Sequence, residues 1–237
     1  MNVHPDSGPY TRLVHGGLSP DPTTGAILPP VVQSTTFVQE AVGQDKGYTY
    51  SRSGNPTVHA LEANLGAIEG SLPATCFSTG MAALTGLFLA RLSAGDHVVC
   101  SDVVYGGTVR LLRQVLARFG VDATFVDTAN LDALAAALTP RTRLVLIETP
   151  ANPTLKLTDV AGAAALVHGA GAHLAVDNTF MTSYLQDVFA LGADFAVYST
   201  TKYIEGHNAT VGGAILTRDP ELHESIRFVR NAVGSIQ

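Results

Sequence analysis

The sequence has few charged residues and very few cysteines. Only 14% of its 237 residues are charged while 46% are hydrophobic, which argues against a disordered chain and favours a large buried core. The two cysteines, Cys76 and Cys100, lie far apart in apolar surroundings, so we expect reduced thiols rather than a disulfide framework or a zinc site. No apolar run reaches membrane-spanning length and the first residues do not resemble a signal peptide, so we expect a cytoplasmic protein without a membrane partner.

Sequence motifs of several common protein classes are also missing. The net charge is −6 and no cluster of lysine and arginine stands out, so we expect no nucleic-acid partner. The sequence contains neither the dinucleotide-binding motif G-x-G-x-x-G nor the hydrolase motif G-x-S-x-G, and it has no Gly-Lys-Ser/Thr phosphate loop. The eight histidines include no H-E-x-x-H pattern, and we expect no metal site.

A segment rich in proline and glycine forms the beginning of the chain, residues 1–57. Proline fixes φ and removes a backbone donor, so regular helix is not expected there. A segment of this length without periodicity buries little of its own surface. We therefore expect an arm that lies across another surface, such as a second subunit, followed by a large domain in residues 58–237.

Short apolar runs alternate with helical periodicity through that domain. Continuous apolar strands separated by helices indicate an α/β fold with a mostly parallel sheet and helices on both faces. In such sheets ligands bind at the carboxyl ends of the strands, so Glu148, Asp177 and Lys202 should lie near one rim. Strands are expected at residues 74–77, 97–100, 121–126, 144–148, 173–177, 194–198 and 213–217, and helices at 58–67, 81–92, 107–119, 131–138 and 160–169.

The lysine that follows the run 194–198 is the first candidate for chemistry. Lys202 has hydroxyl side chains beside it, including Ser199 and Thr201. An amine at the end of a buried strand is costly to desolvate unless it is neutral or covalently used, and hydroxyls suit a bound phosphate. This combination is what pyridoxal 5'-phosphate (PLP) requires, namely an amine for a Schiff base and a cradle for its anionic tail. The alternative reading is a surface lysine just past a strand.

Other polar or aromatic residues occur at the expected strand ends, each with an ordinary structural alternative. The turn before Gly80 and Met81 can hold an anion on backbone N–H groups or simply cap a helix. Tyr105 can stack on a planar ring or cover the core, and Asp177 can keep a pyridine nitrogen protonated or cap a helix. Asn152, in a loop with two prolines, can offer its amide to a ring substituent or belong to a rigid turn. Their order along the chain supplies partners for every part of one PLP molecule.

At this point the sequence resembles the cysteine/methionine-metabolism family of PLP enzymes. The family includes cystathionine γ-lyase, cystathionine γ-synthase, methionine γ-lyase and the homoserine-ester sulfhydrylases. The resemblance runs from Tyr10 to about Thr217. It is carried by Gln33-Ser34-Thr35-Thr36-Phe37, Tyr50-Ser51-Arg52-Ser53-Gly54-Asn55-Pro56-Thr57, Thr79-Gly80-Met81-Ala82-Ala83, Tyr105-Gly106-Gly107-Thr108, Glu148-Thr149-Pro150-Ala151-Asn152-Pro153, Val176-Asp177-Asn178-Thr179 and Thr201-Lys202-Tyr203 with Gly206-His207.

The resemblance implies the fold-type I large domain of PLP-dependent transferases and a role for each candidate residue. Lys202 would form the Schiff base, Asp177 would pair with the ring nitrogen and Tyr105 would stack on the ring. Asn152 would lie near the phenolic oxygen. The phosphate would be held by the backbone N–H groups of Gly80 and Met81, by Ser199 and Thr201, and by Tyr50 and Arg52 of a neighbouring subunit. Family members commonly assemble as dimers of dimers, so we expect a homodimer or homotetramer with shared sites.

The resemblance also implies a reaction. We expect cystathionine γ-lyase-like γ-elimination on a sulfur amino acid, with Lys202 and Tyr105 as catalytic residues. The alternatives are γ-replacement on a homoserine ester by a cystathionine γ-synthase or sulfhydrylase, and a methionine γ-lyase. Family members carry a smaller C-terminal domain whose arginine grips the substrate carboxylate, and we expect residues 58–237 to lack that domain and to be incomplete at the C-terminal end of the large domain. A non-catalytic PLP-binding module is the further alternative.

Overall fold

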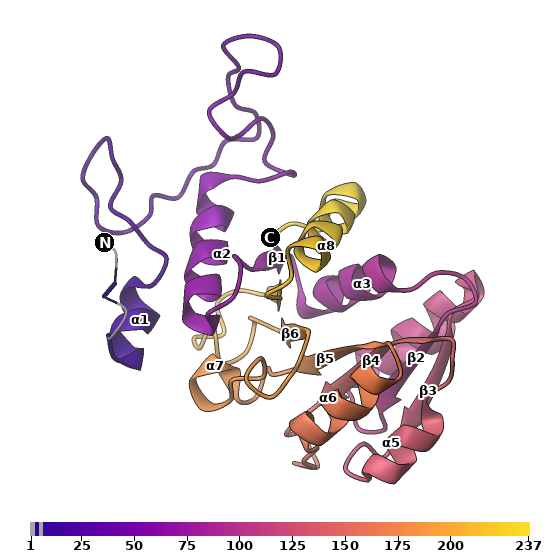
Figure 1. Cartoon of the computed structure of the whole chain (residues 1–237). Helices are drawn as coiled ribbons and strands as arrows, with labels where there is room; N and C mark the ends of the chain where they lie inside the picture. The colour runs from indigo at the N-terminus through magenta and orange to yellow at the C-terminus, as the bar shows by residue number, and fades with distance from the viewer. Residues whose placement is uncertain (1–2, 5–6) are drawn as a thin grey trace.

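The computed structural model describes residues 3–4 and 7–237, and seven strands of that part form one sheet (Figure 1). The strand order is β1-β7-β6-β5-β4-β2-β3, and neighbouring strands are parallel except that β7 runs antiparallel to both β1 and β6. The mostly parallel α/β fold expected from the sequence is therefore confirmed. The strands are β1 (Thr75–Phe77), β2 (His97–Ser101), β3 (Asp122–Val126), β4 (Thr142–Glu148), β5 (His173–Asp177), β6 (Phe195–Tyr198) and β7 (Gly213–Leu216).

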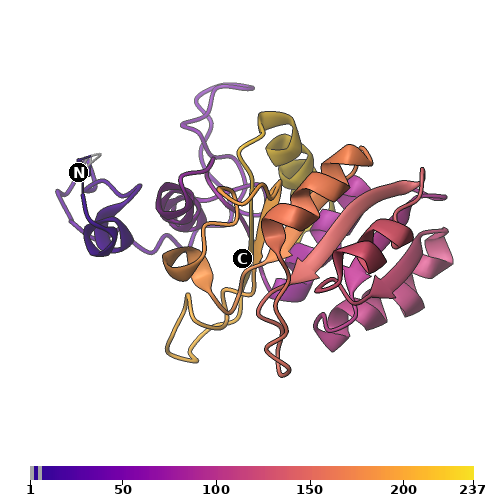
Figure 2. The same ribbon diagram turned by 60° about the horizontal axis from the view of Figure 1, so that its bottom comes forward.

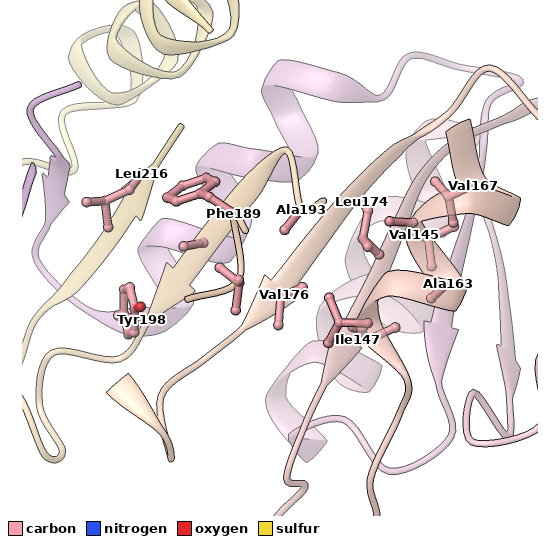
Figure 3. Packing of buried hydrophobic residues seen from close by; sticks show 14 of the residues in the cluster. Val145, Ile147, Ala163, Val167, Leu174, Val176, Phe189, Ala193, Tyr198 and Leu216 are labelled. Atoms are coloured by element: carbon pink, nitrogen blue, oxygen red, sulfur yellow. The ribbon is translucent and has the colours of Figure 1, made fainter. Parts of the chain in front are cut away.

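Helices cover both faces of this sheet. Alternate residues of one strand point to opposite faces, so Val145 and Ile147 of β4 belong to one apolar cluster and Leu144 and Leu146 to another. The first cluster packs against α2, α5 and α6, as Figure 3 shows for α6, and the second packs against α3 and α8. The helices are α1 (Pro9–His15), α2 (Pro56–Glu69), α3 (Gly80–Arg91), α4 (Gly106–Arg110), α5 (Leu131–Ala137), α6 (Val160–Gly169), α7 (Thr182–Leu185) and α8 (Pro220–Val233).

The expected helix at 107–119 is not one regular helix. After α4 the chain continues as a π turn, η1 (Leu111–Val115), and a 3₁₀ turn, η2 (Leu116–Phe119). The change of helical pitch leaves Leu112 and Leu116 buried, whereas Phe119 is 66% exposed. A regular α-helix over these residues would have turned a different set of side chains toward the sheet.

The arm contains one short helix, although its proline content predicts none. The short helix α1 begins at Pro9, where the missing N–H costs nothing because the first-turn donors have no helical partner. It contacts α2, and the hydroxyl of Tyr10 lies 2.9 Å from that of Tyr184 at α7. Figures 1 and 2 show the rest of the arm, coloured indigo to purple, projecting away from the sheet.

Helix α8 was also absent from the sequence prediction. It begins at an N-cap, Asp219, whose carboxylate accepts hydrogen bonds from two backbone N–H groups of the first turn. Leu222 and Ile226 pack it onto the second apolar cluster. Its buried Arg230 pairs with the buried Glu62 of α2, so α8 ties the two faces of the domain together. Among the described residues, no helix is long and apolar enough to span a bilayer.

Candidate active site

A cavity of about 330 Å³ opens at the carboxyl end of the sheet. Its wall includes every candidate residue of the sequence reading except Tyr50 and Arg52. The residues brought together are Gly80, Met81, Tyr105, Asn152, Asp177, Ser199, Thr201 and Lys202. Thr79, Leu84, Glu148, Thr179, Phe180, Val197 and Val211 complete the lining. The rule that parallel sheets bind ligands at this edge accounts for the convergence.

The start of α3 forms one end of the cavity. Thr79 caps this helix by accepting from the N–H of Ala82 at 3.0 Å, so that donor is used. The N–H groups of Gly80 and Met81 have no acceptor within the described residues. A Cβ atom on Gly80 would come within 2.9 Å of the Ser199 Cβ atom, so the start of α3 can lie this close to Ser199 only because residue 80 is glycine. Unpaired N–H groups at a helix start favour an anion.

Two hydroxyls lie at the same end, but they are not equivalent. The Ser199 hydroxyl has no hydrogen bond within the described residues, while the Ser199 backbone N–H donates to the Thr179 hydroxyl at 2.8 Å. The Thr201 hydroxyl donates to the carbonyl of Gly212 at 3.2 Å and accepts from the Gly212 N–H at 3.0 Å. Ser199 therefore offers a free donor to an anion, whereas the donor of Thr201 is already engaged.

Two carboxylates in the cavity lining belong to neighbouring strands. Glu148 and Asp177 end β4 and β5 and are partners in the parallel register. Burial raises the pKa of Asp177, while hydrogen bonds from Thr179 oppose the rise. Burial also raises the pKa of Glu148, and the charge of Asp177 adds to that effect. A cation bound between these groups would be stabilised by opposite charge.

An aromatic ring and an amide flank the carboxylates. The ring of Tyr105 is exposed at the start of α4, and it lies so close to Gly107 that a Cβ atom there would come within 2.5 Å of the ring. The backbone N–H of Tyr105 donates to Glu148 Oε2 at 2.8 Å, and that of Asn152 donates to Glu148 Oε1 at 3.1 Å. A single carboxylate thus contacts both loops.

The lysine occupies a different environment from the one expected. Strand β6 ends at Tyr198, and Lys202 lies in the turn that follows, where its side chain is exposed rather than buried. The turn is closed by hydrogen bonds from the Lys202 N–H to Ser199 and from Gly206 to the Lys202 carbonyl, at 3.1 and 2.9 Å. Its ammonium group has no ion pair within the described residues. The desolvation argument from the sequence was wrong for this chain, although the amine does line the cavity.

Tyr50 and Arg52 lie outside the cavity. Tyr50 is 45% exposed and forms an isolated bridge with Thr36. The Arg52 guanidinium stands 5.5 Å from the Tyr50 ring centre and donates to the side chain and carbonyl of Asn231, at 2.9 and 3.0 Å. In this chain Arg52 is attached to α8, and Tyr50 lies beside Arg52 rather than beside the other candidate residues.

The sequence reading missed the parts of the site that depend on contacts between loops. The sequence places Glu148 at a strand end and Thr179 in a family motif but predicts no role for either, and it gives no signal for Phe180. The Phe180 ring meets the Tyr203 ring edge-on at 5.8 Å beside the lysine turn. The register of two adjacent strands could have paired Glu148 with Asp177. No local sequence signal predicts that the loops of Tyr105 and Asn152 both donate hydrogen bonds to Glu148. The described residues contain no group of three potential metal ligands.

Comparisons with known proteins agree with this site. A cystathionine gamma-synthase of Mycobacterium bovis is 49% identical over 231 residues, which cover 97% of this chain and 60% of that protein. A cystathionine beta-lyase of Lactococcus lactis is 45% identical over 226 residues, covering 95% of this chain and 59% of that protein. The crystal structure of cystathionine gamma-lyase from Lactobacillus plantarum complexed with L-serine superposes with a TM-score of 0.94 at 42% identity, over 97% of this chain and 60% of the other.

The chain thus spans about 60% of the length of the relatives that it matches. Over its own length the agreement is continuous, since the family profile described as Cys/Met metabolism PLP-dependent enzyme matches residues 10–237. The resemblance seen in the sequence is confirmed, and with it PLP as the cofactor of the family. This chain belongs to the PLP-dependent enzymes of cysteine and methionine metabolism.

Proposed function

We propose that this chain is the cofactor-binding part of a cytoplasmic trans-sulfuration enzyme that cleaves a carbon–sulfur bond by γ-elimination. Cystathionine and water would give cysteine, 2-oxobutanoate and ammonia. The convergence of Lys202, Asp177 and the start of α3 on one cavity is the observation that carries the proposal. Residues 58–237 would form the PLP-binding domain, and residues 1–57 an arm.

The residues present fit PLP. The unpaired N–H groups of Gly80 and Met81, with the Ser199 hydroxyl, would hold the phosphate, and the missing Cβ of Gly80 leaves room for it. Thr201 would join them if its hydroxyl turned from the carbonyl of Gly212. Asp177 would hold the ring nitrogen protonated by opposite charge.

Each side chain would then have a defined task in the reaction. Bound PLP supplies an electron sink for carbanion chemistry at the substrate. Lys202, which has no ion-pair partner within the described residues, would bind the cofactor and later take the proton from the substrate Cα. The exposed ring of Tyr105 would cover the cofactor, and its hydroxyl would give a proton to the departing sulfur. Asn152 would orient the ring by its amide.

Covalent attachment of the cofactor provides the first test. Borohydride reduction of the PLP-loaded protein followed by peptide mapping should recover the pyridoxyl group on the peptide containing Lys202. Lys202→Ala should lose both this label and turnover. A Lys202→Ala protein that still retained PLP covalently and turned over normally would refute the assignment.

A second candidate reaction is γ-replacement, because the Mycobacterium bovis relative is named a cystathionine gamma-synthase. The Lactococcus lactis relative named a cystathionine beta-lyase adds β-elimination, which the sequence reading did not consider. Three incubations separate these reactions: cystathionine alone, an activated homoserine with cysteine, and methionine. Faster formation of cystathionine than of 2-oxobutanoate would overturn γ-elimination, and pyruvate from cystathionine would indicate the β-lyase reaction. Retention of PLP without turnover of any substrate would favour the non-catalytic module.

We further propose that the arm crosses to a second copy of the chain in a homodimer or homotetramer. Apolar arm residues such as Leu28, Val38 and Val42 are exposed in the single chain, which supports this arrangement. Tyr50 and Arg52 would then reach the phosphate of the partner's site. Mixing inactive Lys202→Ala and Arg52→Ala proteins should restore activity, because mixed dimers would contain one intact site. Mixtures that stay inactive although mixed dimers form would contradict the sharing of sites.

A further inference from the structure

Glu148 uses both of its carboxylate oxygens to hold two separate loops. Oε2 accepts from the N–H of Tyr105, which lies 43 residues before it in the sequence, at 2.8 Å. Oε1 accepts from the N–H of Asn152 at 3.1 Å. Hydrogen bonds from backbone N–H groups to a carboxylate are charge-assisted and stronger than neutral ones. The proposed ring-stacking residue and the proposed ring-orienting amide therefore share one anchor.

Glu148 lines the cavity, and a second contact, made by Lys156 outside the cavity lining, also joins these loops. The Lys156 ammonium lies 3.0 Å from Asp102 and 2.8 Å from Asp127, so it already links the loop of Asn152 to the ends of β2 and β3. Lys156 is partly exposed, whereas Glu148 lines the cavity. The Lys156 ion pairs alone would join the two loops, so the hydrogen bonds of Glu148 are not needed merely to connect them.

The position of Glu148 is unfavourable for an ionised carboxylate. It is the register partner of Asp177, and burial together with the charge of Asp177 opposes its ionisation. A neutral side chain would avoid this repulsion but could not accept from two N–H groups in the same way. The geometry is thus specific to a carboxylate that serves both loops.

We infer that Glu148 is a positioning residue. It holds the loops of Tyr105 and Asn152 next to Asp177, so that all three residues can contact the ring of one bound cofactor. The inference rests on the proposed function, since it assumes that Tyr105 and Asn152 face the cofactor. Glu148 itself acts through these two residues and not on the substrate.

The variant Glu148→Gln isolates this role because it keeps the size of the side chain. A glutamine has one acceptor oxygen, so its NH₂ group must face one of the two backbone N–H groups. One loop should then be released while the other stays in place. Glu148→Asp keeps the charge but is one methylene shorter, and it should also fail to reach both loops. Asp102→Asn is the matched control, because Asp102 follows a neighbouring strand and lies outside the cavity lining, and Lys156 retains Asp127.

Hydrogen exchange at single amides tests the anchor without any cofactor. In PLP-free protein the Tyr105 and Asn152 amides should be protected, and Glu148→Gln should speed exchange at one of them by about tenfold or more, the loss of one charge-assisted hydrogen bond. Asp102→Asn should leave both rates unchanged. Unchanged rates at both amides in Glu148→Gln and Glu148→Asp would overturn the inference.

Cofactor and kinetic measurements test the positioning. Glu148→Gln should shift the visible absorption of bound PLP and lower kcat at least about tenfold with a smaller change in KM, since alignment is lost more than substrate binding. Faster exchange with an unchanged spectrum and unchanged kcat would make Glu148 a purely structural tie and overturn the positioning role. Failure of the proposed function would look different, because the wild-type protein would then bind no PLP while the exchange result stood.

Discussion

Replacing Glu69 by glutamine is expected to remove a pH dependence from the stability of the domain. Glu69 ends α2, is 7% exposed, and accepts a hydrogen bond from the hydroxyl of the buried Tyr198. That hydroxyl in turn accepts from the Asn178 side chain at 2.8 Å. Burial raises the pKa of Glu69 to about 7, an effect that the Tyr198 hydroxyl and Arg218 partly oppose and Asp187 increases.

The sign and size of the effect follow from this shift. The unfolded chain loses the proton of Glu69 near pH 4.5, whereas the folded chain keeps it up to about pH 7. The contribution to stability is therefore complete below pH 4.5, declines through the window and is lost above about pH 7. A difference of about 2.5 pH units, at about 1.36 kcal/mol per unit, corresponds to at most about 3 kcal/mol.

Urea unfolding at pH 5 and pH 8 measures the effect. Other groups also titrate in this range, so the quantity of interest is the difference between wild type and Glu69→Gln at each pH. Glutamine can still accept from the Tyr198 hydroxyl, and we expect the variant to gain stability over wild type as the pH rises. Glu224→Gln, at an exposed position of α8, should follow the wild-type curve. A Glu69→Gln curve parallel to wild type would refute the argument that burial controls this carboxyl.

Three further substitutions test the cradle, the link between the faces and a helix start. Gly80→Ala places a methyl group 2.9 Å from the Ser199 Cβ atom and should weaken PLP binding about tenfold or more, measured by equilibrium titration; unaltered affinity would contradict the tight approach. Arg230→Met removes the guanidinium partner of the buried Glu62 carboxylate and should cost about 3–5 kcal/mol in urea unfolding, with a loss below 1 kcal/mol as the contrary result. Asn55→Ala removes the N-cap of α2 and should cost about 1 kcal/mol, while Asn55→Asp should restore most of it.

Much of the site could be predicted from the sequence because parallel strands all end at the same edge. Once the strands were recognised by their apolar runs, Asp177 and the loop of Asn152 had to lie near one rim. The turn at Gly80 was equally readable, since a glycine between a strand and a helix is a local signal. These predictions needed the direction of each strand and no knowledge of how distant loops pack.

The parts that could not be predicted depend on tertiary contacts or on weak local signals. The apolar run predicts the end of β6 at Tyr198 correctly, but it does not predict how the turn after the strand is placed, and that turn leaves Lys202 exposed. The role inferred for Glu148 depends on its hydrogen bonds to two loops from different parts of the chain, which the sequence does not predict. Helix α8 is a different case, because Asp219-Pro220-Glu221 is a helix-start signal that can be recognised in the sequence.

The reversed direction of β7 has a consequence for the anion end of the cavity. Strands β1 and β6 leave the sheet at this rim, while β7, lying between them, enters there at Gly213. The segments that follow β1 and β6 must therefore pass across the start of β7 to bring Gly80 close to Ser199. A Cβ atom on Gly213 would stand 2.3 Å from the carbonyl oxygen of Thr79, so the incoming strand must begin without a side chain. The close packing of β7 under the start of α3 therefore depends on Gly213, a glycine that lies outside the cavity lining.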